Sequence, residues 1–183
     1  MKTETIDLSR AYRLLNHGPA VLVSTTDGAV PNACTVAWCA PVSKSPALFV
    51  LAISDEHKTW ANLAATRECV LNLPTVDALD ALWVCGTETG HDGDKLGPAG
   101  IDVLPGRVVA PPRLACCVAW IEARLVETLV REDMSLVIVE AVAAETLPGV
   151  VDAHGHLDVA RHRTLHHLGG SRFMLPGEVI DRA

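Results

Sequence analysis

The sequence predicts a mainly β protein, built on a closed antiparallel Greek-key barrel with a few short helices. Apolar runs rich in β-branched residues recur along the chain, and only two segments have helical spacing. The dipeptide Asp27-Gly28 between two such runs is a strong hairpin signal. A doubly wound parallel sheet would need a helix after nearly every strand, and closing the sheet also removes its exposed edges.

The first half of the chain predicts four strands and one helix. The strands fall at 19–26, 31–38, 46–53 and 67–73. Between the last two, the segment 57–66 has helical spacing, with Trp60 and Leu63 on one face. We expect Ser54 or Asp55 to cap this helix, because short polar side chains accept hydrogen bonds from the first free N–H groups.

The second half predicts one more helix and two long strands. We expect the helix over 75–85 and the strands over 114–129 and 135–147. Between them, 86–113 is rich in Gly and Pro and predicts a long loop, with one helical turn at 94–96. Ordered loops of this length are often functional.

Bulk composition restricts the class of protein. The 183 residues are 49% hydrophobic, which predicts one domain, 1–183. A net charge of −7 and the lack of a basic run argue against binding to nucleic acid. No apolar run is long enough for a signal peptide or a membrane span, so we expect a cytoplasmic protein without a membrane partner. The six cysteines include no CxxC pair, and we expect free thiols in the core.

The run PNACTVAW (31–38) combines small residues with polar ones. Strand alternation places its residues on two faces, Asn32, Cys34, Val36 and Trp38 on one, and Ala33, Thr35, Ala37 and Cys39 on the other. Small side chains let a flat ligand lie against the backbone. The alternative is a half-buried strand whose polar residues face water.

The run SDEHKTW (54–60) follows a buried strand directly. Lys58 then lies in the first turn of the predicted helix, where a cation is unfavourable by roughly 0.3–1 kcal/mol. Either Lys58 extends into water, or an anion binds at this helix start. With Ser54, His57 and Thr59 the segment would suit a phosphate, and together with the 31–38 platform it would suit a mononucleotide.

These motifs resemble the flavin reductase-like, FMN-binding split-barrel family, in particular its flavoredoxin branch. The similar stretches are PNACTVAWCAPVSKSPALFVLAIS, HKTWANLAATRECVLNLP, GTETGHDGDKLGPAGIDVLPG and LHHLGGSRFM. They cover roughly residues 15–175. The chain departs from the family pattern at Cys39, at His91 where an Arg is usual, at Leu96, and at Phe173 where a Tyr is usual.

The resemblance implies a split barrel that binds FMN at the interface of a homodimer. It implies that the ring and ribityl chain lie along Asn32, Thr35, Val36, Ala37 and Trp38, and that the phosphate is held by Ser54, His57, Lys58 and Thr59. Asn62 matches the same motif and is predicted to bind the cofactor too. Lys95 would reach the flavin from the long loop, and Phe173 from the tail.

The activity implied is that of an NAD(P)H-dependent flavin oxidoreductase, which reduces flavin or a small acceptor. The cofactor carries the chemistry, so no side chain is predicted as catalytic acid, base or nucleophile. An alternative is a flavoredoxin-type electron carrier that another protein reduces. A further alternative is metal binding by the segment 154–167, in which His154 and His156 would share a strand face and His162 and His166 a helix face.

Overall fold

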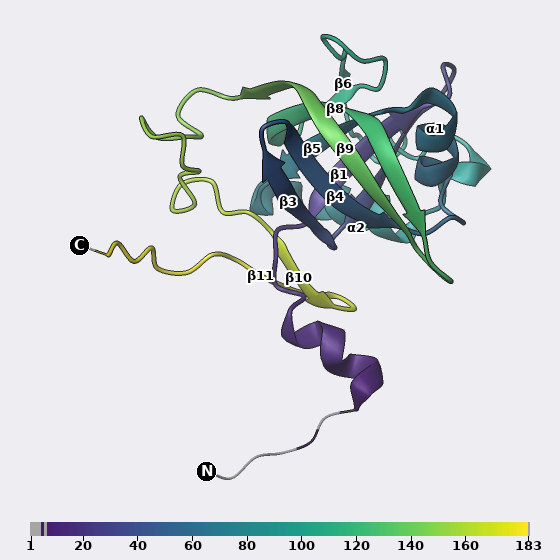
Figure 1. The fold of residues 1–183 in the computed structure, drawn as a ribbon. Coiled ribbons are helices and arrows are strands. Elements are labelled where there is room, and N and C mark those ends of the chain that lie inside the picture. The colour runs from purple at the N-terminus through teal and green to yellow at the C-terminus, as the bar shows by residue number, and fades with distance from the viewer. Residues whose placement is uncertain (1–4, 6, 183) are drawn as a thin grey trace.

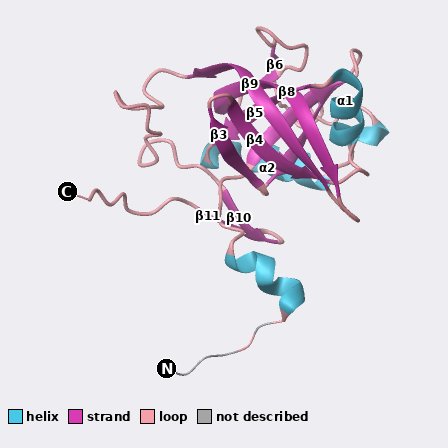
Figure 2. Cartoon of the chain, in the orientation of Figure 1, coloured by secondary structure: helices cyan, strands magenta, loops and turns pink. Residues whose placement is uncertain are grey.

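The computed structural model describes residues 5 and 7–182, and a seven-stranded antiparallel sheet forms its centre (Figures 1 and 2). The strand order is β2-β1-β5-β8-β9-β4-β3. The bounds are β1 (Val21–Thr26), β2 (Pro31–Val36), β3 (Cys39–Lys44), β4 (Ala47–Ile53), β5 (Glu68–Pro74), β8 (Cys117–Val130) and β9 (Ser135–Thr146). The predicted mainly β fold is confirmed.

The sheet curls because its two end strands are neighbours in the chain. β2 and β3 are consecutive, yet they occupy opposite ends of the strand order. Just beyond β2, the carbonyl of Trp38 accepts a 2.9 Å hydrogen bond from the N–H of Ala52 in β4. In the part of the chain that the structure describes, β2 and β3 form no ladder with each other, which leaves the barrel split along this line.

Two α-helices and three 3₁₀ helices complete the chain with two short hairpins. The helices are η1 (Leu8–Leu14), α1 (Lys58–Thr66), η2 (Val76–Ala78), α2 (Leu79–Thr87) and η3 (Gly90–Asp92). The hairpins pair β6 (Val103–Leu104) with β7 (Arg113–Leu114), and β10 (His166–Gly169) with β11 (Arg172–Met174). α1 packs on β1 and α2 on β2, while η1 projects from the barrel (Figure 1).

Strands β1 and β5 and the first half of β8 are largely buried on both faces. Val23 and Leu71 point into the barrel, where they pack with residues of β4 and β9. Leu22, Val70 and Trp120 point outward into a second core, which α2, the long loop and the tail cover. This double burial explains why the corresponding runs of sequence are almost continuously apolar.

The tail from 163 onward is fastened to two early segments. The N–H of Ala20 donates to the carbonyl of Leu165 at 2.8 Å, and His166 Nδ1 lies 2.7 Å from the carbonyl of His17. The N–H of Val76 donates to the carbonyl of Arg163 at 2.9 Å. These bonds fix the β10–β11 hairpin beside the outer end of β2. No described helix has the length and apolar character needed to cross a membrane.

Several predicted elements need correction. The segment 39–44 forms β3, which was missed because Pro41 breaks the apolar alternation and a bulge follows it. The helix predicted over 75–85 is a 3₁₀ turn followed by α2, which runs on to Thr87. The helical turn expected at 94–96 lies earlier, at Gly90–Asp92. Helix η1 was also missed.

The predicted cap of α1 is wrong as well. The N-cap is His57, and no described side chain makes the capping hydrogen bond. Ser54 Oγ accepts instead from the N–H of Glu56, at 3.4 Å. The first turn of α1 therefore keeps its positive end directed at the space in front of it.

Candidate functional site

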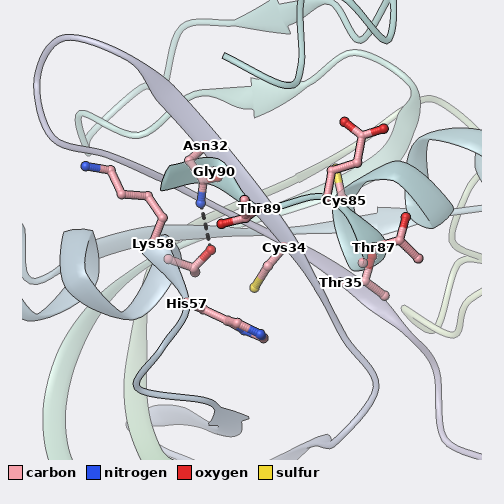
Figure 3. Close-up of a pocket in the computed structure, with 12 residues that line it drawn as sticks. Asn32, Cys34, Thr35, His57, Lys58, Cys85, Thr87, Thr89 and Gly90 are labelled. Carbon is pink, nitrogen blue, oxygen red and sulfur yellow. Dashed lines mark hydrogen bonds between the residues drawn. The ribbon is translucent and has the colours of Figure 1, made fainter. Parts of the chain in front are cut away.

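A cleft runs along β2 and consists of three hollows that share lining residues. The first, the helix-end hollow, lies between β2, the start of α1 and the segment after α2, and has a volume of about 150 Å³ (Figure 3). It is lined by Asn32, Cys34, Thr35, His57, Lys58, Thr59, Cys85, Gly86, Thr87, Glu88, Thr89 and Gly90. The uncapped start of α1 forms one wall, which favours a negatively charged group there.

Asn32 and Thr59 form the polar floor of the helix-end hollow. Asn32 Nδ2 donates a 2.7 Å hydrogen bond to Thr59 Oγ1, drawn as the dashed line in Figure 3. Both side chains are at least 95% buried. Asn32 Oδ1 has no hydrogen-bond partner among the described residues. A buried, unpaired carbonyl oxygen is costly, so this atom calls for a donor such as a ligand hydroxyl.

Two glycines keep the opposite wall close. A Cβ atom on Gly90 would lie 2.0 Å from Asn32 Oδ1, and one on Gly86 would lie 3.2 Å from Thr35 Cβ. Any other residue at 90 would push Asn32 out of place. The narrow slot between the glycines and β2 therefore depends on the missing side chains.

Two further hollows adjoin the outer end of β2. The strand-end hollow, of about 300 Å³, is lined by Tyr12, Asn16, Thr35, Val36, Ala37, Trp38, Ala52, Ile53, Ser54, His57, Asp133, Met134, His167, Gly169 and Gly170. The aromatic hollow, of about 340 Å³, is lined by Thr35, Ala37, Leu82, Trp83, Gly86, Thr87, His167, Gly170 and Phe173. Thr35 lines all three hollows.

The structure brings most of the predicted site residues to this cleft. Asn32, Thr35, His57, Lys58 and Thr59 line the helix-end hollow. Val36, Ala37, Trp38 and Ser54 line the strand-end hollow, and Phe173 the aromatic one.

Three of these residues also have structural contacts. Thr35 Oγ1 donates to the carbonyl of Leu82 at 2.6 Å, and Trp38 Nε1 donates to Asn16 Oδ1 at 2.8 Å. The side chain of Val36 is buried in the barrel core, so only its backbone is free to meet a ligand.

Lys58 points away from the helix-end hollow. In Figure 3 its ammonium extends away from Cys34 and Cys85, and Nζ pairs with Asp27 Oδ2 at 2.9 Å. Asp27 is the hairpin residue between β1 and β2. This ion pair is partly exposed, so it is weak and open to competition from another anion.

Two predicted residues lie outside the three hollows. Asn62 lies on the buried side of α1, and its Nδ2 donates to Thr25 Oγ1 of β1 at 3.2 Å. Lys95 is 7% exposed, and its Nζ donates to the carbonyls of Cys85 at 3.1 Å and Glu88 at 2.7 Å. Lys95 thus closes the C-terminal end of α2, immediately behind the wall that Cys85 and Glu88 present to the hollow.

The buried ammonium of Lys95 adds positive potential to the helix-end hollow from behind the wall that Cys85 and Glu88 form. Burial lowers the pKa of His57 below its ordinary value, and the nearby charge of Lys95 lowers it further. His57 is therefore mainly neutral at neutral pH and would serve a ligand as a hydrogen-bonding group. Lys95 and the dipole of α1 supply the positive potential.

Sequence reasoning missed several residues of the cleft. Gly86, Thr87 and Gly90 lie in the segment predicted as a long loop, where nothing in the sequence gives their direction. His167 lines two hollows and packs on Phe173 with ring centroids 5.1 Å apart. In the sequence, only the position of His167 between Leu165 and Gly169-Gly170 could have indicated that it lines the cleft.

The metal-binding alternative loses its geometric basis. His154 and His156 lie in a loop, and no helix carries His162 and His166 together. Within residues 5 and 7–182 no group of three or more His, Cys, Asp or Glu side chains could hold a metal ion. All six cysteines are free thiols; Cys39 and Cys116 are partly exposed and the other four are buried.

Comparisons with known proteins agree with this architecture. Residues 13–175 match the family described as "Flavin reductase like domain". The chain is 34% identical over 187 residues to the uncharacterized protein YddH of Escherichia coli K12, with 96% of this chain and 95% of the relative covered. The chain therefore belongs to the flavin reductase-like domain family.

Solved structures give the same result. An FMN-binding domain of a flavin reductases-like enzyme from Shewanella baltica has a TM-score of 0.80 at 29% identity, covering 98% of this chain and 97% of that one. Flavoredoxin of Desulfovibrio vulgaris has a TM-score of 0.86 at 19% identity, with 100% and 97% covered. The fold is that of the FMN-binding split barrels.

The residues of the cleft fit FMN. The uncapped start of α1 suits a phosphate, and the unpaired Asn32 Oδ1 suits a hydroxyl donor such as those of a ribityl chain. The absence of side chains at Gly86 and Gly90 leaves room for a narrow, hydroxyl-bearing chain between these residues and β2. The strand-end hollow offers the small residue Ala37 and free backbone for a planar ring.

Proposed function

We propose that this chain binds FMN in the cleft along β2 and acts as an oxidoreductase that uses NAD(P)H to reduce flavin or a small acceptor. The observation that carries the proposal is the polar floor of the helix-end hollow. Asn32 Oδ1 is buried without a partner, next to an uncapped helix start and opposite a glycine that its side chain almost touches. This arrangement costs stability unless a ligand completes it.

Each part of the cleft has a task. The start of α1 with Thr59 would bind the phosphate, and Lys58 would leave Asp27 to join it. Asn32 would bind the ribityl chain, and Thr35, Ala37 and Trp38 would orient the ring. Bound FMN would supply reversible electron transfer, and its surroundings would tune the potential. Lys95 donates to the carbonyls of Cys85 and Glu88, and its positive charge would favour negative charge on the bound group.

A homodimer is part of the proposal. Leu8, Leu14 and Leu15 of the N-terminal arm are between 65% and 88% exposed. The same arm supplies Tyr12 to the strand-end hollow. Apolar side chains so exposed at a ligand cleft suit burial by a second copy, which would then cover one side of the flavin. Light scattering on the purified protein tests this, and a monomer at micromolar concentration would contradict it.

A flavoredoxin-type carrier is the second candidate. It is supported by flavoredoxins from Desulfovibrio vulgaris and Methanosarcina acetivorans, which share this fold with TM-scores of 0.86 and 0.87. In that role the chain would bind FMN in the same cleft but would receive electrons from another protein.

One visible-absorption experiment separates these functions. Purified protein is titrated with FMN, and then NADH or NADPH is added without oxygen. We expect flavin bands that shift on binding and bleach with one of the two nucleotides. If FMN binds but its absorption bands persist after both NADH and NADPH are added, the result would favour the electron carrier. Absence of binding would overturn the FMN proposal itself.

A further inference from the structure

The aromatic hollow has a composition unlike the rest of the cleft. Trp83 and Phe173 meet edge to face with ring centroids 6.5 Å apart, and His167 lies against Phe173. Trp83 remains 42% exposed although it is the largest side chain there. The hollow's lining exposes far more apolar than polar surface.

This hollow adjoins the strand-end hollow without being part of it. The two share Thr35, Ala37, His167 and Gly170, so these four residues form the boundary. The strand residues predicted to lie along the flavin ring, including Val36 and Trp38, line the strand-end side, whereas Phe173, expected to reach the flavin from the tail, lines the aromatic hollow. A ring placed there leaves the aromatic hollow open beside it.

We propose that the aromatic hollow is the binding site for the electron acceptor, and that the acceptor is a planar, uncharged conjugated ring. This inference rests on the proposed FMN function. The volume of about 340 Å³ lies at the lower end of the roughly 300–1,000 Å³ typical of small-molecule sites. A flat molecule there would lie against the pair that Trp83 and Phe173 form, in the offset or edge-on geometries that aromatic groups prefer.

The lining also determines the preference for a neutral ring. Among the described residues that line the hollow, only His167 can carry a charge. A charged acceptor would have to give up its hydration without an oppositely charged partner, which is unfavourable. Thr87 Oγ1 donates to the carbonyl of Trp83 at 2.8 Å, and His167 Nε2 lies 2.9 Å from the carbonyl of Gly170. Each side chain keeps a position that can accept a hydrogen bond from a polar substituent, and His167 lies at the edge shared with the strand-end hollow.

The alternative occupant is the flavin ring itself. Thr35, Gly86 and Thr87 also join the aromatic hollow to the helix-end hollow, so a ring could extend that way. The two arrangements differ in one respect. If the ring occupies the aromatic hollow, loss of Trp83 weakens FMN binding; if the acceptor occupies it, the same change leaves FMN affinity intact.

The test uses the FMN-loaded protein and isothermal titration calorimetry with naphthalene-2-methanol. Its saturated counterpart, decahydronaphthalene-2-methanol, controls for planarity, and naphthalene-2-carboxylate controls for charge. We expect the planar neutral alcohol to bind at least tenfold more tightly than either control. We expect Trp83→Leu and Phe173→Leu each to weaken it by about three- to tenfold.

Two variants guard against trivial explanations. Phe49→Leu changes the only other Phe, which lines a separate apolar cavity, and it should leave naphthyl binding unchanged. Trp83→Phe should restore most of the affinity that Trp83→Leu loses. Thermal unfolding of each variant checks that it is folded.

The outcomes separate the two proposals. Equal binding of planar and saturated alcohols, or unchanged affinity in both leucine variants, overturns the acceptor site. A parallel loss of FMN affinity in Trp83→Leu also overturns it, because the hollow then holds the flavin ring. If wild-type protein binds no FMN, the function proposed above fails instead, independently of the naphthyl result.

Discussion

Asn32 and Thr59 lie 27 positions apart, yet Asn32 Nδ2 donates a 2.7 Å hydrogen bond to Thr59 Oγ1. The bond joins the start of β2 to the first turn of α1. It leaves Asn32 Oδ1, which is buried against Gly90, without a hydrogen-bond partner among the described residues. The pair therefore holds the helix start against β2, and under the proposed function it would also contact the ligand.

Thr59→Ala removes the acceptor that holds Asn32 in place. We expect FMN binding to weaken by about 1–3 kcal/mol, because a buried amide then loses its partner and a phosphate contact is lost. Fluorescence quenching of FMN on titration with protein measures this. Thr66→Ala is the matched control, because Thr66 lies in the last turn of the same helix and donates to the carbonyl of Asn62. Equal losses in both variants would contradict a local role for Thr59.

The Lys58–Asp27 ion pair predicts opposite effects of two substitutions. Lys58→Ala should weaken FMN by about 1–3 kcal/mol if the ammonium moves to the phosphate. Asp27→Asn should strengthen FMN binding modestly, because it releases Lys58 and removes a negative charge near the site. The same titration measures both. Unchanged affinity in Lys58→Ala would mean that Lys58 stays with Asp27 when FMN binds.

Gly90→Ala tests the narrow slot. The added Cβ would lie 2.0 Å from Asn32 Oδ1, so Asn32 must move and the polar floor is disturbed. We expect at least a tenfold loss of FMN affinity, equivalent to about 1.4 kcal/mol. Gly177→Ala is the control, since a Cβ there meets nothing within 4 Å. A Gly90→Ala variant that binds FMN normally would show that the slot is wider than the static structure indicates.

Glu122 predicts a pH dependence of stability. Its carboxylate accepts hydrogen bonds from the N–H groups of Arg107 and Val108, both at 2.7 Å, and of Val109 at 3.1 Å. Burial alone would raise the pKa of Glu122, but these three donors and nearby Arg113 lower it below its ordinary value of 4.5. The stabilisation is thus complete above pH 4.5 and is lost as the pH falls through the lowered value.

Glu122→Gln should therefore be destabilised at pH 7 by about 1–3 kcal/mol, because one oxygen cannot accept all three bonds. Urea unfolding at a series of pH values measures the difference from wild type. We expect the difference to shrink as the pH approaches the lowered pKa. A constant difference down to pH 3 would contradict the assignment.

Cys116 and Cys39 are both partly exposed but should react differently. Hydrogen bonding from Cys117 lowers the pKa of Cys116 to about 7, whereas burial raises the pKa of Cys39 to about 11. Because the thiolate is the nucleophile, iodoacetamide at pH 7.5 should modify Cys116 first. Peptide mass spectrometry over time follows both sites. Faster labelling of Cys39 would refute the prediction.

Cys116→Ser and Cys117→Ser should leave FMN binding intact.

Local patterns were enough to predict much of the fold. Asp27-Gly28 forms the expected turn, in which Asp27 Oδ1 accepts from the N–H groups of Ala29 and Val30 at 3.0 Å. The predicted alternation along β2 is also found, since Cys34 and Val36 face the barrel core while Ala33 packs in the outer core. Both features depend on residues close together in sequence, where the period of two decides the direction.

Features that depend on distant partners were missed or incomplete. The pairing of Lys58 with Asp27 spans 31 positions, and nothing near Lys58 in the sequence indicates it. The same holds for Lys95, whose side chain turns back to the end of α2 instead of lining a hollow. His167 enters the cleft only because the tail pairs with segments near 19 and 75. Such contacts are decided by tertiary packing, which local propensity does not encode.

The dependence of the cleft on that tail has a consequence for synthesis on the ribosome. All seven strands of the main sheet are complete at Thr146, and α1 and α2 precede that point. The cleft residues His167, Gly170 and Phe173 come more than twenty positions after Thr146 in the sequence. A nascent chain can therefore form the whole main sheet before the tail is present. At that stage the strand-end hollow and the aromatic hollow each still lack the wall that the tail supplies. Since chains are made at about 5–20 residues per second, the tail residues that complete these hollows follow the last strand of the sheet by on the order of seconds.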